Sequence, residues 1–311
     1  MDTPNIDELF ERRITFPDFE PQERLARLVG LDDQKTRLIK ILGLLVNPVG
    51  LGNWVEKNHP GASDVVNAVL RRPPLVILAG DVGSGKTELA ETIGDAVARQ
   101  EDIELTLYPL SLSSRGQGRV GEMTQLLTNA FDHALDAAQK LKGSSGKNRG
   151  GVILLVDEAD ALAQSREASQ MHHEDRAGVN AFIRGIDRIA NAKVPAAVIM
   201  CTNRLNALDP AIKRRSADIM AFSRPNDEQR TSVLEPTLTS LGFSSKEVKV
   251  IVEMTGATED RDFGFTFSDL MQRLIPSIVL DAYPNQKVTP SRSIEIVQGI
   301  IPTPPFQDEV P

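Results

Sequence analysis

The chain has 311 residues, 41% hydrophobic and 25% charged, which is the composition of an ordinary globular protein with room for one large core. Its net charge of −8 leaves no basic footprint for nucleic acid, and its single cysteine excludes an internal disulfide and favours the cytoplasm. The first residues lack the basic and apolar stretches of a signal peptide, and no apolar run of about 18 residues predicts a membrane span.

The first part of the chain predicts one clear helix. Residues 1–28 are polar with a few apolar positions, so we expect an arm or a short helix packed on a larger body. Apolar residues recur at helical spacing from Asp32 to Val46, which predicts a helix there. The stretch from Asn47 to Gly61 is rich in glycine, asparagine and proline and predicts an irregular loop.

Strand and helix patterns alternate in the middle of the chain. Strands are predicted at residues 75–79, 104–110, 152–156, 196–201 and 218–222. Helices are predicted between them, for example from Met123 to Leu141 and from Gly178 to Ala190. This alternation indicates an α/β fold in which a parallel sheet carries helices on both faces.

The pattern becomes mostly helical beyond Pro225, which indicates a second, smaller domain. Helical stretches are predicted at 228–241, 245–254 and 268–282. We therefore expect four parts in chain order. They are an arm at 1–28, a large α/β domain at 29–224, a small helical lid at 225–285 and a tail at 286–311.

The segment from Gly80 to Thr87, GDVGSGKT, fits the phosphate-binding loop G-x-x-x-x-G-K-[ST] between a strand and a helix. Its glycines let backbone N–H groups converge on phosphate oxygens at a helix amino terminus. We expect Lys86 to reach the β- and γ-phosphates of ATP and Thr87 to coordinate Mg²⁺. The other residues expected around the nucleotide are Asp81, Val82, Gly83, Ser84, Gly85 and Glu88. A chance match in a glycine-rich turn is the alternative, which the flanking strand and helix disfavour.

A second motif ends the apolar strand at 152–156 with two carboxylates, Asp157 and Glu158. The carboxyl edge of an open parallel sheet is where such folds bind ligands. We expect Asp157 to hold Mg²⁺, mostly through water, and Glu158 to act as the general base on the attacking water. The alternative is a strand that runs into a solvated acidic loop.

Two further motifs follow the next strand. Thr202 and Asn203 end it, and Asn203 is expected to hydrogen-bond the γ-phosphate and the attacking water, unless it merely opens a turn. Lys213, Arg214 and Arg215 precede the strand at 218–222. In a ring they would face a neighbour's γ-phosphate as arginine fingers, and a solvated basic face is the alternative.

These four motifs in order resemble the AAA+ ATPases over about residues 25–285. The resemblance implies that the backbone of Val29, Gly30 and Leu31 contacts adenine. It also places Ser268 in the lid region where many AAA+ branches carry an arginine called sensor 2, with Arg273 one turn further on.

Within AAA+, the chain resembles the pachytene-checkpoint remodellers and their short bacterial relatives. The segments that carry this resemblance are Leu31–Lys35, Asp157–Leu162, Asn180–Asp187 and Ser216–Ile219. It implies a homo-hexameric cytoplasmic ring that uses ATP and Mg²⁺ to open a closed HORMA-domain protein, within anti-phage signalling by cyclic oligonucleotides. The partner would be a protein, with neither nucleic acid nor membrane involved.

A ring of this kind grips its substrate with pore loops. The resemblance places the first at Ser113 to Glu122, with Arg119, Val120 and Gly121 at the contact. Family members usually carry an aromatic side chain there, and its absence favours a limited pull on a chosen substrate. A second candidate pore loop spans Gln164 to Arg176. A plain surface loop is the alternative for both segments.

Two other functions stay open at this level. One is an AAA+ nucleic-acid motor or loader, which the acidic balance and the missing basic tail disfavour. The other is a non-catalytic scaffold switched by bound ATP, which needs no water-activating carboxylate. The presence of Glu158 and Asn203 disfavours that scaffold.

Overall fold

The fold is taken from a computed structural model, which describes residues 9–112, 122–143, 147–162, 173–259 and 261–306. The chain divides into two compact units. The sheet unit comprises residues 1–27, 33–79 and 87–221, and the helical unit comprises residues 28–32, 80–86 and 222–311.

The sheet has six strands in the order β1-β3-β4-β5-β2-β6. They are β1 (Ile14–Phe16), β2 (Leu75–Gly80), β3 (Glu104–Ser111), β4 (Gly150–Asp157), β5 (Ala196–Thr202) and β6 (Ser216–Phe222). Strands β3, β4, β5 and β2 pair in parallel, whereas β1 pairs antiparallel with β3. The β4–β5 register sets Val156 opposite Met200, so Asp157 and Thr202 end neighbouring strands at one edge. This edge is the carboxyl edge of the sheet.

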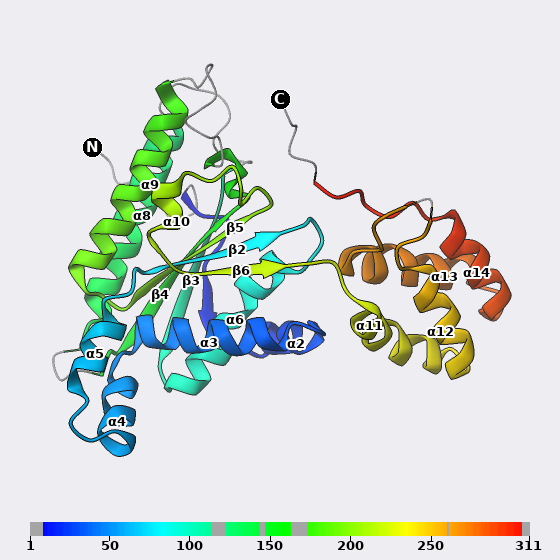
Figure 1. The fold of residues 1–311 in the computed structure, drawn as a ribbon, viewed down its shortest axis with the longest axis horizontal. Coiled ribbons are helices and arrows are strands. Elements are labelled where there is room, and N and C mark those ends of the chain that lie inside the picture. The colour runs from blue at the N-terminus through cyan, green and yellow to red at the C-terminus, as the bar shows by residue number, and fades with distance from the viewer. Residues whose placement is uncertain (1–8, 113–121, 144–146, 163–172, 260, 307–311) are drawn as a thin grey trace. The chain divides into compact units, whose positions relative to one another are not determined.

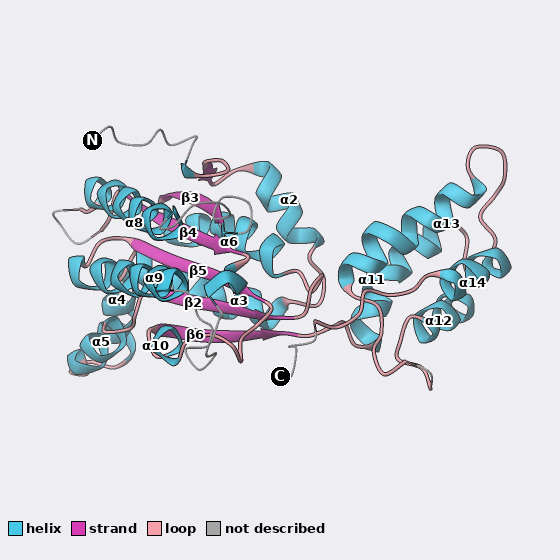
Figure 2. Cartoon of the chain, turned by 90° about the horizontal axis from the view of Figure 1, so that it is seen from above, coloured by secondary structure: helices cyan, strands magenta, loops and turns pink. Residues whose placement is uncertain are grey.

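Helices cover both faces of this sheet (Figure 1), which confirms the predicted fold class. The helical elements of the sheet unit are α2 (Phe19–Arg27), α3 (Asp32–Val46), α4 (Val49–Asn58), α5 (Ser63–Leu70), α6 (Lys86–Glu101), α8 (Glu122–Leu141), the 3-10 turn η1 (Ala159–Leu162), α9 (His173–Ala192) and α10 (Pro210–Lys213). Helices α8 and α9 lie side by side on one face (Figure 2). Their Phe131 and Phe182 stack edge to face and are fully buried against the strands. Each such ring contributes about 1.5–3 kcal/mol by leaving water.

The helical unit has a core of its own. Its helices are α11 (Asp227–Ser240), α12 (Ser245–Met254), the π-helical turn η2 (Asp269–Leu274), α13 (Ile275–Ala282) and α14 (Pro290–Gly299). Capping boxes begin α11 and α12, because Asn226 and Ser244 accept from the backbone N–H three residues on. Phe265 and the inward residues of these helices, among them Leu234 and Ile251, form one buried cluster. A helical part therefore follows the sheet, as the sequence predicts.

Some local predictions were wrong. Asn47 to Gly61 is not a loop, because Val49–Asn58 forms α4, and a second helix, α5, follows it. The helix expected at 268–282 is present as one continuous helical run, in which η2 is π-helical and α13, with Pro276 in its first turn, is α-helical. Helix α14 within the expected tail was not predicted.

Among the described residues, no single helix is long and apolar enough to cross a membrane. The pair α3 and α4, bent by 106°, meets that test only in length and composition.

Candidate active site

The phosphate loop, residues 80–86, belongs to the helical unit and has the backbone its glycines require. Gly83 and Gly85 have φ of 70° and 92°, a region that disfavours side chains. A Cβ on Gly83 would also lie 2.7 Å from the Thr266 hydroxyl. Lys86 is 7% exposed, and its ammonium donates to the carbonyls of Gly80 at 2.9 Å and Asp81 at 2.7 Å. The loop thus holds a buried cation at a helix amino terminus, as phosphate binding needs.

Other segments of the helical unit fasten this loop. The Asp81 carboxylate pairs with the Arg224 guanidinium at 2.6 Å and also accepts from the backbone N–H of Phe306 at 3.2 Å. The backbone N–H of Ser268 donates to the Gly83 carbonyl at 3.2 Å. The sequence did not single out Arg224, because its partner is 143 residues away.

The segment expected to contact adenine lies against the same loop. A Cβ on Gly85 would lie 3.2 Å from Leu31, and the Gly30 carbonyl accepts from the Gln229 amide at 2.6 Å. Val29 packs on the helical core.

The two carboxylates expected to serve hydrolysis, Asp157 and Glu158, lie at the carboxyl edge of the sheet unit. The Thr87 hydroxyl donates to Asp157 at 3.3 Å, so the two expected Mg²⁺ ligands lie next to each other. Burial raises the pKa of Asp157 above its ordinary value, more than its hydrogen bonds lower it. The Ser111 hydroxyl, at the end of β3, donates to Glu158 at 2.7 Å. Glu158 has a φ of 50°, a strained backbone of the kind found at functional sites.

Asn203 does not stand alone but is held by a carboxylate that the sequence did not single out. Asp160, in the turn after β4, accepts from the Asn203 side-chain amide at 3.0 Å and its backbone N–H at 2.8 Å. It also accepts from the Thr202 hydroxyl at 2.6 Å. These bonds fix the orientation of the Asn203 side chain at the edge where Asp157 ends β4.

The two candidate fingers differ in their surroundings. Arg215 forms a two-pronged ion pair with Asp187 of α9, at 2.7 and 3.1 Å, and donates to the Ala211 carbonyl. These bonds raise the pKa of Arg215. Arg214 is exposed, and its side chain has no ion pair or hydrogen bond within the described residues. The geometry therefore favours Arg214 as the group that can reach a neighbour.

Glu88 is engaged by the amino-terminal arm. Arg24 of α2 reaches both Glu88 and Glu91 at 2.8 Å, and these pairs raise its pKa. This contact ties α2 to the first turns of α6, and local sequence gives no sign of it.

The remaining predicted residues belong to the two pore loops and to the lid. Arg119, Val120, Gly121 and residues 164–172 of the second pore loop lie outside the described residues. In the lid, Ser268 donates to Gln272, and Arg273 pairs with the buried Asp269 at 2.8 Å.

The donor set fits Mg²⁺ bound together with ATP. Among the described residues, no cluster of three or more His, Cys, Asp or Glu side chains could hold a metal alone. Mg²⁺ needs no such cluster, since one or two protein oxygens and the substrate phosphates suffice. Thr87 and Asp157, which lie next to each other, would provide those oxygens.

Comparisons with known proteins agree with this geometry. Residues 76–224 match the model of the ATPase family associated with various cellular activities (AAA). A chain in the structure titled "Structure of E. coli MS115-1 HORMA:CdnC:Trip13 complex" superposes with a TM-score of 0.91 at 67% identity, covering 98% of this chain and 100% of that one. The chain of "Structure of Rhizobiales Trip13" superposes with a TM-score of 0.75 at 53% identity, covering 96% and 100%.

The fold, the phosphate loop and the Asp-Glu strand end define an ATPase of the AAA class. The CD-NTase-associated protein 6 of Escherichia coli strain MS 115-1 is 68% identical over 305 residues, 98% of each chain. This chain belongs to the family of that protein, and the predicted resemblance is confirmed.

Proposed function

We propose that the chain is the ATP-driven subunit of a hexameric ring that opens a HORMA-domain protein. The observation that carries this proposal is the 0.91 TM-score, at 67% identity, with a chain of a complex titled as containing HORMA and CdnC. Near-complete coverage of both chains supports a common activity rather than a common domain alone.

The chemistry at the carboxyl edge supports hydrolysis rather than a passive nucleotide switch. Glu158, held by Ser111 at 2.7 Å, is the base that takes a proton from the attacking water. Asn203, oriented by Asp160, positions that water and the γ-phosphate. Lys86 binds the β- and γ-phosphates, and Mg²⁺ at Thr87 and Asp157 would neutralise charge on them. Arg214 of the next subunit would complete the site as an arginine finger.

Hydrolysis in each subunit would move the pore loops, Arg119–Gly121 and residues 164–176, against the substrate. An aliphatic and a cationic side chain at the first loop suit a limited pull, which fits the opening of one folded partner.

The proposal is tested with a HORMA-domain protein closed around a fluorescent peptide. Peptide release, followed by anisotropy, is expected with ATP but not with a slowly hydrolysed analogue. Glu158→Gln should bind ATP and slow both hydrolysis and release by about 10²-fold or more, since it lacks the base. Glu253→Gln, exposed in α12, is the matched control and should behave as wild type. Release that proceeds at the wild-type rate in Glu158→Gln would contradict coupled remodelling.

A further inference from the structure

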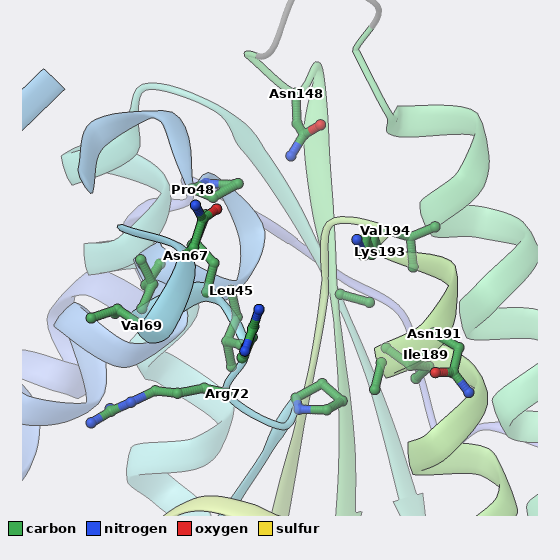
Figure 3. Close-up of a pocket in the computed structure, with 16 residues that line it drawn as sticks. Leu45, Pro48, Asn67, Val69, Arg72, Asn148, Ile189, Asn191, Lys193 and Val194 are labelled. Carbon is green, nitrogen blue, oxygen red and sulfur yellow. The ribbon is translucent and has the colours of Figure 1, made fainter. Parts of the chain in front are cut away.

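A cavity of about 620 Å³, drawn in Figure 3, opens at the edge of the sheet opposite to the one where Asp157 ends β4. Its lining includes Pro74, which directly precedes β2, Ala196, the first residue of β5, and Asn148, which precedes β4. Strands of six to eight residues separate this amino edge from Asp157, a distance of about 20 Å or more. The cavity, here called the amino-edge pocket, is therefore distinct from the nucleotide site.

The pocket has an unusual charge for this chain. Arg71, Arg72 and Lys193 line it, and none of its lining residues, all within the described part of the chain, is acidic or aromatic. The whole chain carries a net charge of −8. Within the described residues, no ion pair or side-chain hydrogen bond engages these three cations. An anionic ligand is therefore favoured, and the missing aromatic rings disfavour a stacked base.

Two helices end at the pocket, and their carbonyl ends narrow the chemistry of the ligand that would fit there. Helix α5 ends at Leu70 and α9 at Ala192, and the last carbonyls of a helix need donors. Each helix end carries about half a negative charge, so three cations leave a positive excess. The pocket thus offers backbone carbonyls to the hydrogen-bond donors of a ligand and cationic side chains to its acceptors. Phosphate supplies only acceptors, whereas a polypeptide with acidic side chains supplies both.

The α4–α5 hairpin beside the pocket points to a protein partner. It lies between α3 and β2, where a connection of about 2–6 residues is usual. Helix α5 has no buried residue, and α4 buries only Val55. Trp54, Val65 and Leu70 remain 51%, 48% and 41% exposed, and Leu70 also lines the pocket. An ordered insertion that adds little to the core, with apolar side chains on its surface, is typical of an interaction surface.

The pocket's own side chains match both parts of such a ligand. In Figure 3, Lys193 and Asn67 lie on opposite walls, with Leu45 and Val69 on the Asn67 side. Aliphatic residues of the ligand would pack on Leu45, Val69 and Leu70, and its carboxylates would reach Lys193 and the arginines.

We propose that the amino-edge pocket and the α4–α5 hairpin dock an acidic segment of a partner protein that carries aliphatic side chains between its carboxylates. This docking is a binding function separate from ATP hydrolysis and from the pore. It can be present whether or not the ring remodels a HORMA-domain protein.

The test selects ligands without assuming the partner. A library of random twelve-residue peptides displayed on phage is panned against the full chain with ATP present. The enriched peptides are synthesised with a fluorescent label, and their binding is measured by anisotropy. We expect peptides rich in Asp and Glu with interspersed Leu, Ile or Val.

Two charge-reversal variants decide where such peptides bind. Arg71→Glu, Arg72→Glu and Lys193→Glu together should weaken binding at least about tenfold, because three attractions become repulsions. Lys40→Glu, Arg184→Glu and Lys246→Glu change the net charge equally at exposed sites elsewhere and should leave binding within about twofold. Basal ATPase activity should be retained in both. If the triple variant of Arg71, Arg72 and Lys193 loses basal ATPase activity, the milder Arg71→Gln, Lys193→Gln double variant replaces it.

Three outcomes would overturn the proposal. Enriched peptides could be neutral or basic, or both triple variants could lose binding alike. A twelve-nucleotide thymidine oligonucleotide could bind the wild type but not the pocket triple variant, while the acidic peptides bind neither. That result would assign the site to nucleic acid.

Discussion

At the residue scale, Asp157 differs from a residue that only stabilises the fold, because its charged form is placed for the proposed Mg²⁺ site. Its carboxylate ends a buried strand, and burial is the largest influence on its pKa, which lies above the ordinary 3.8. A carboxylate with a raised pKa in the folded state binds protons more tightly there than in the unfolded chain. Its ionisation therefore costs stability, fully so above the raised pKa and not at all below 3.8. The fold accepts this cost at the position where we propose that Mg²⁺ binds.

Asp157→Asn should stabilise the nucleotide-free chain at neutral pH because it removes that buried charge and keeps an oxygen for the Thr87 bond. We expect its melting temperature to exceed that of wild type by a few degrees at pH 7. As the pH falls from the raised pKa toward 3.8, the difference should shrink to nothing. Thermal unfolding from pH 3.5 to 8 measures this, with Asp64→Asn, in the first turn of α5, as the control. A difference that stays constant with pH would show that burial of the charge is not the cause.

Motif residues could be predicted from sequence, and the residues that hold them could not. Asp157 ends β4, Asn203 directly follows β5 and Lys86 begins α6 after the phosphate loop, each in a recognisable local pattern. Ser111 and Asp160 are defined by hydrogen bonds to residues 47 and 43 positions away. Only the parallel register of the strands brings those side chains together.

The same contrast holds at the scale of elements. The helix from Asp32 to Val46 was predicted to the residue because its apolar positions repeat at helical spacing and become buried, Leu38 and Leu42 fully. Helix α4 was mistaken for a loop because it has glycines and buries a single residue, so it shows little apolar periodicity. Helix α14 begins at Pro290, and proline reads as a breaker although it suits the first helical turn.

The link between the phosphate loop and the start of the lid gives the element-scale prediction. Asp81 and Arg224 are 17% and 13% exposed, so their ion pair is largely removed from water. Asp81→Asn or Arg224→Gln should each weaken ATP binding about tenfold, because the loop that presents Lys86 loses its anchor. The double variant should be no weaker than either single one, since both remove the same interaction.

Calorimetric titration of ATP into the four proteins completes this cycle. Arg292→Gln breaks an exposed pair with Asp281 in the same unit and should leave the affinity unchanged. Effects of the two substitutions that simply add would mean that Asp81 and Arg224 act independently, and the link would be rejected.

At the scale of the whole molecule, the proposed ring decides which arginine can act on ATP. Arg215 is committed to Asp187 within its own subunit, whereas Arg214 is exposed. If Arg214 acts on the neighbour's ATP, Arg214→Ala should bind ATP normally and hydrolyse it about 10³-fold more slowly. Arg215→Ala should instead lower the melting temperature, because it leaves Asp187 without its partner.

Mixing the right variants shows whether Arg214 acts across the subunit boundary. Arg214→Ala subunits keep an intact phosphate loop, and Lys86→Ala subunits keep an intact Arg214. In mixed rings a Lys86→Ala subunit can place its Arg214 beside the intact ATP site of an Arg214→Ala neighbour, so part of the activity that each lacks alone should return. The Lys86→Ala, Arg214→Ala double variant in place of Lys86→Ala is the matched control and should restore nothing. Native mass spectrometry verifies that the mixed rings form. Mixed rings without recovered hydrolysis would show that Arg214 is not a finger in trans.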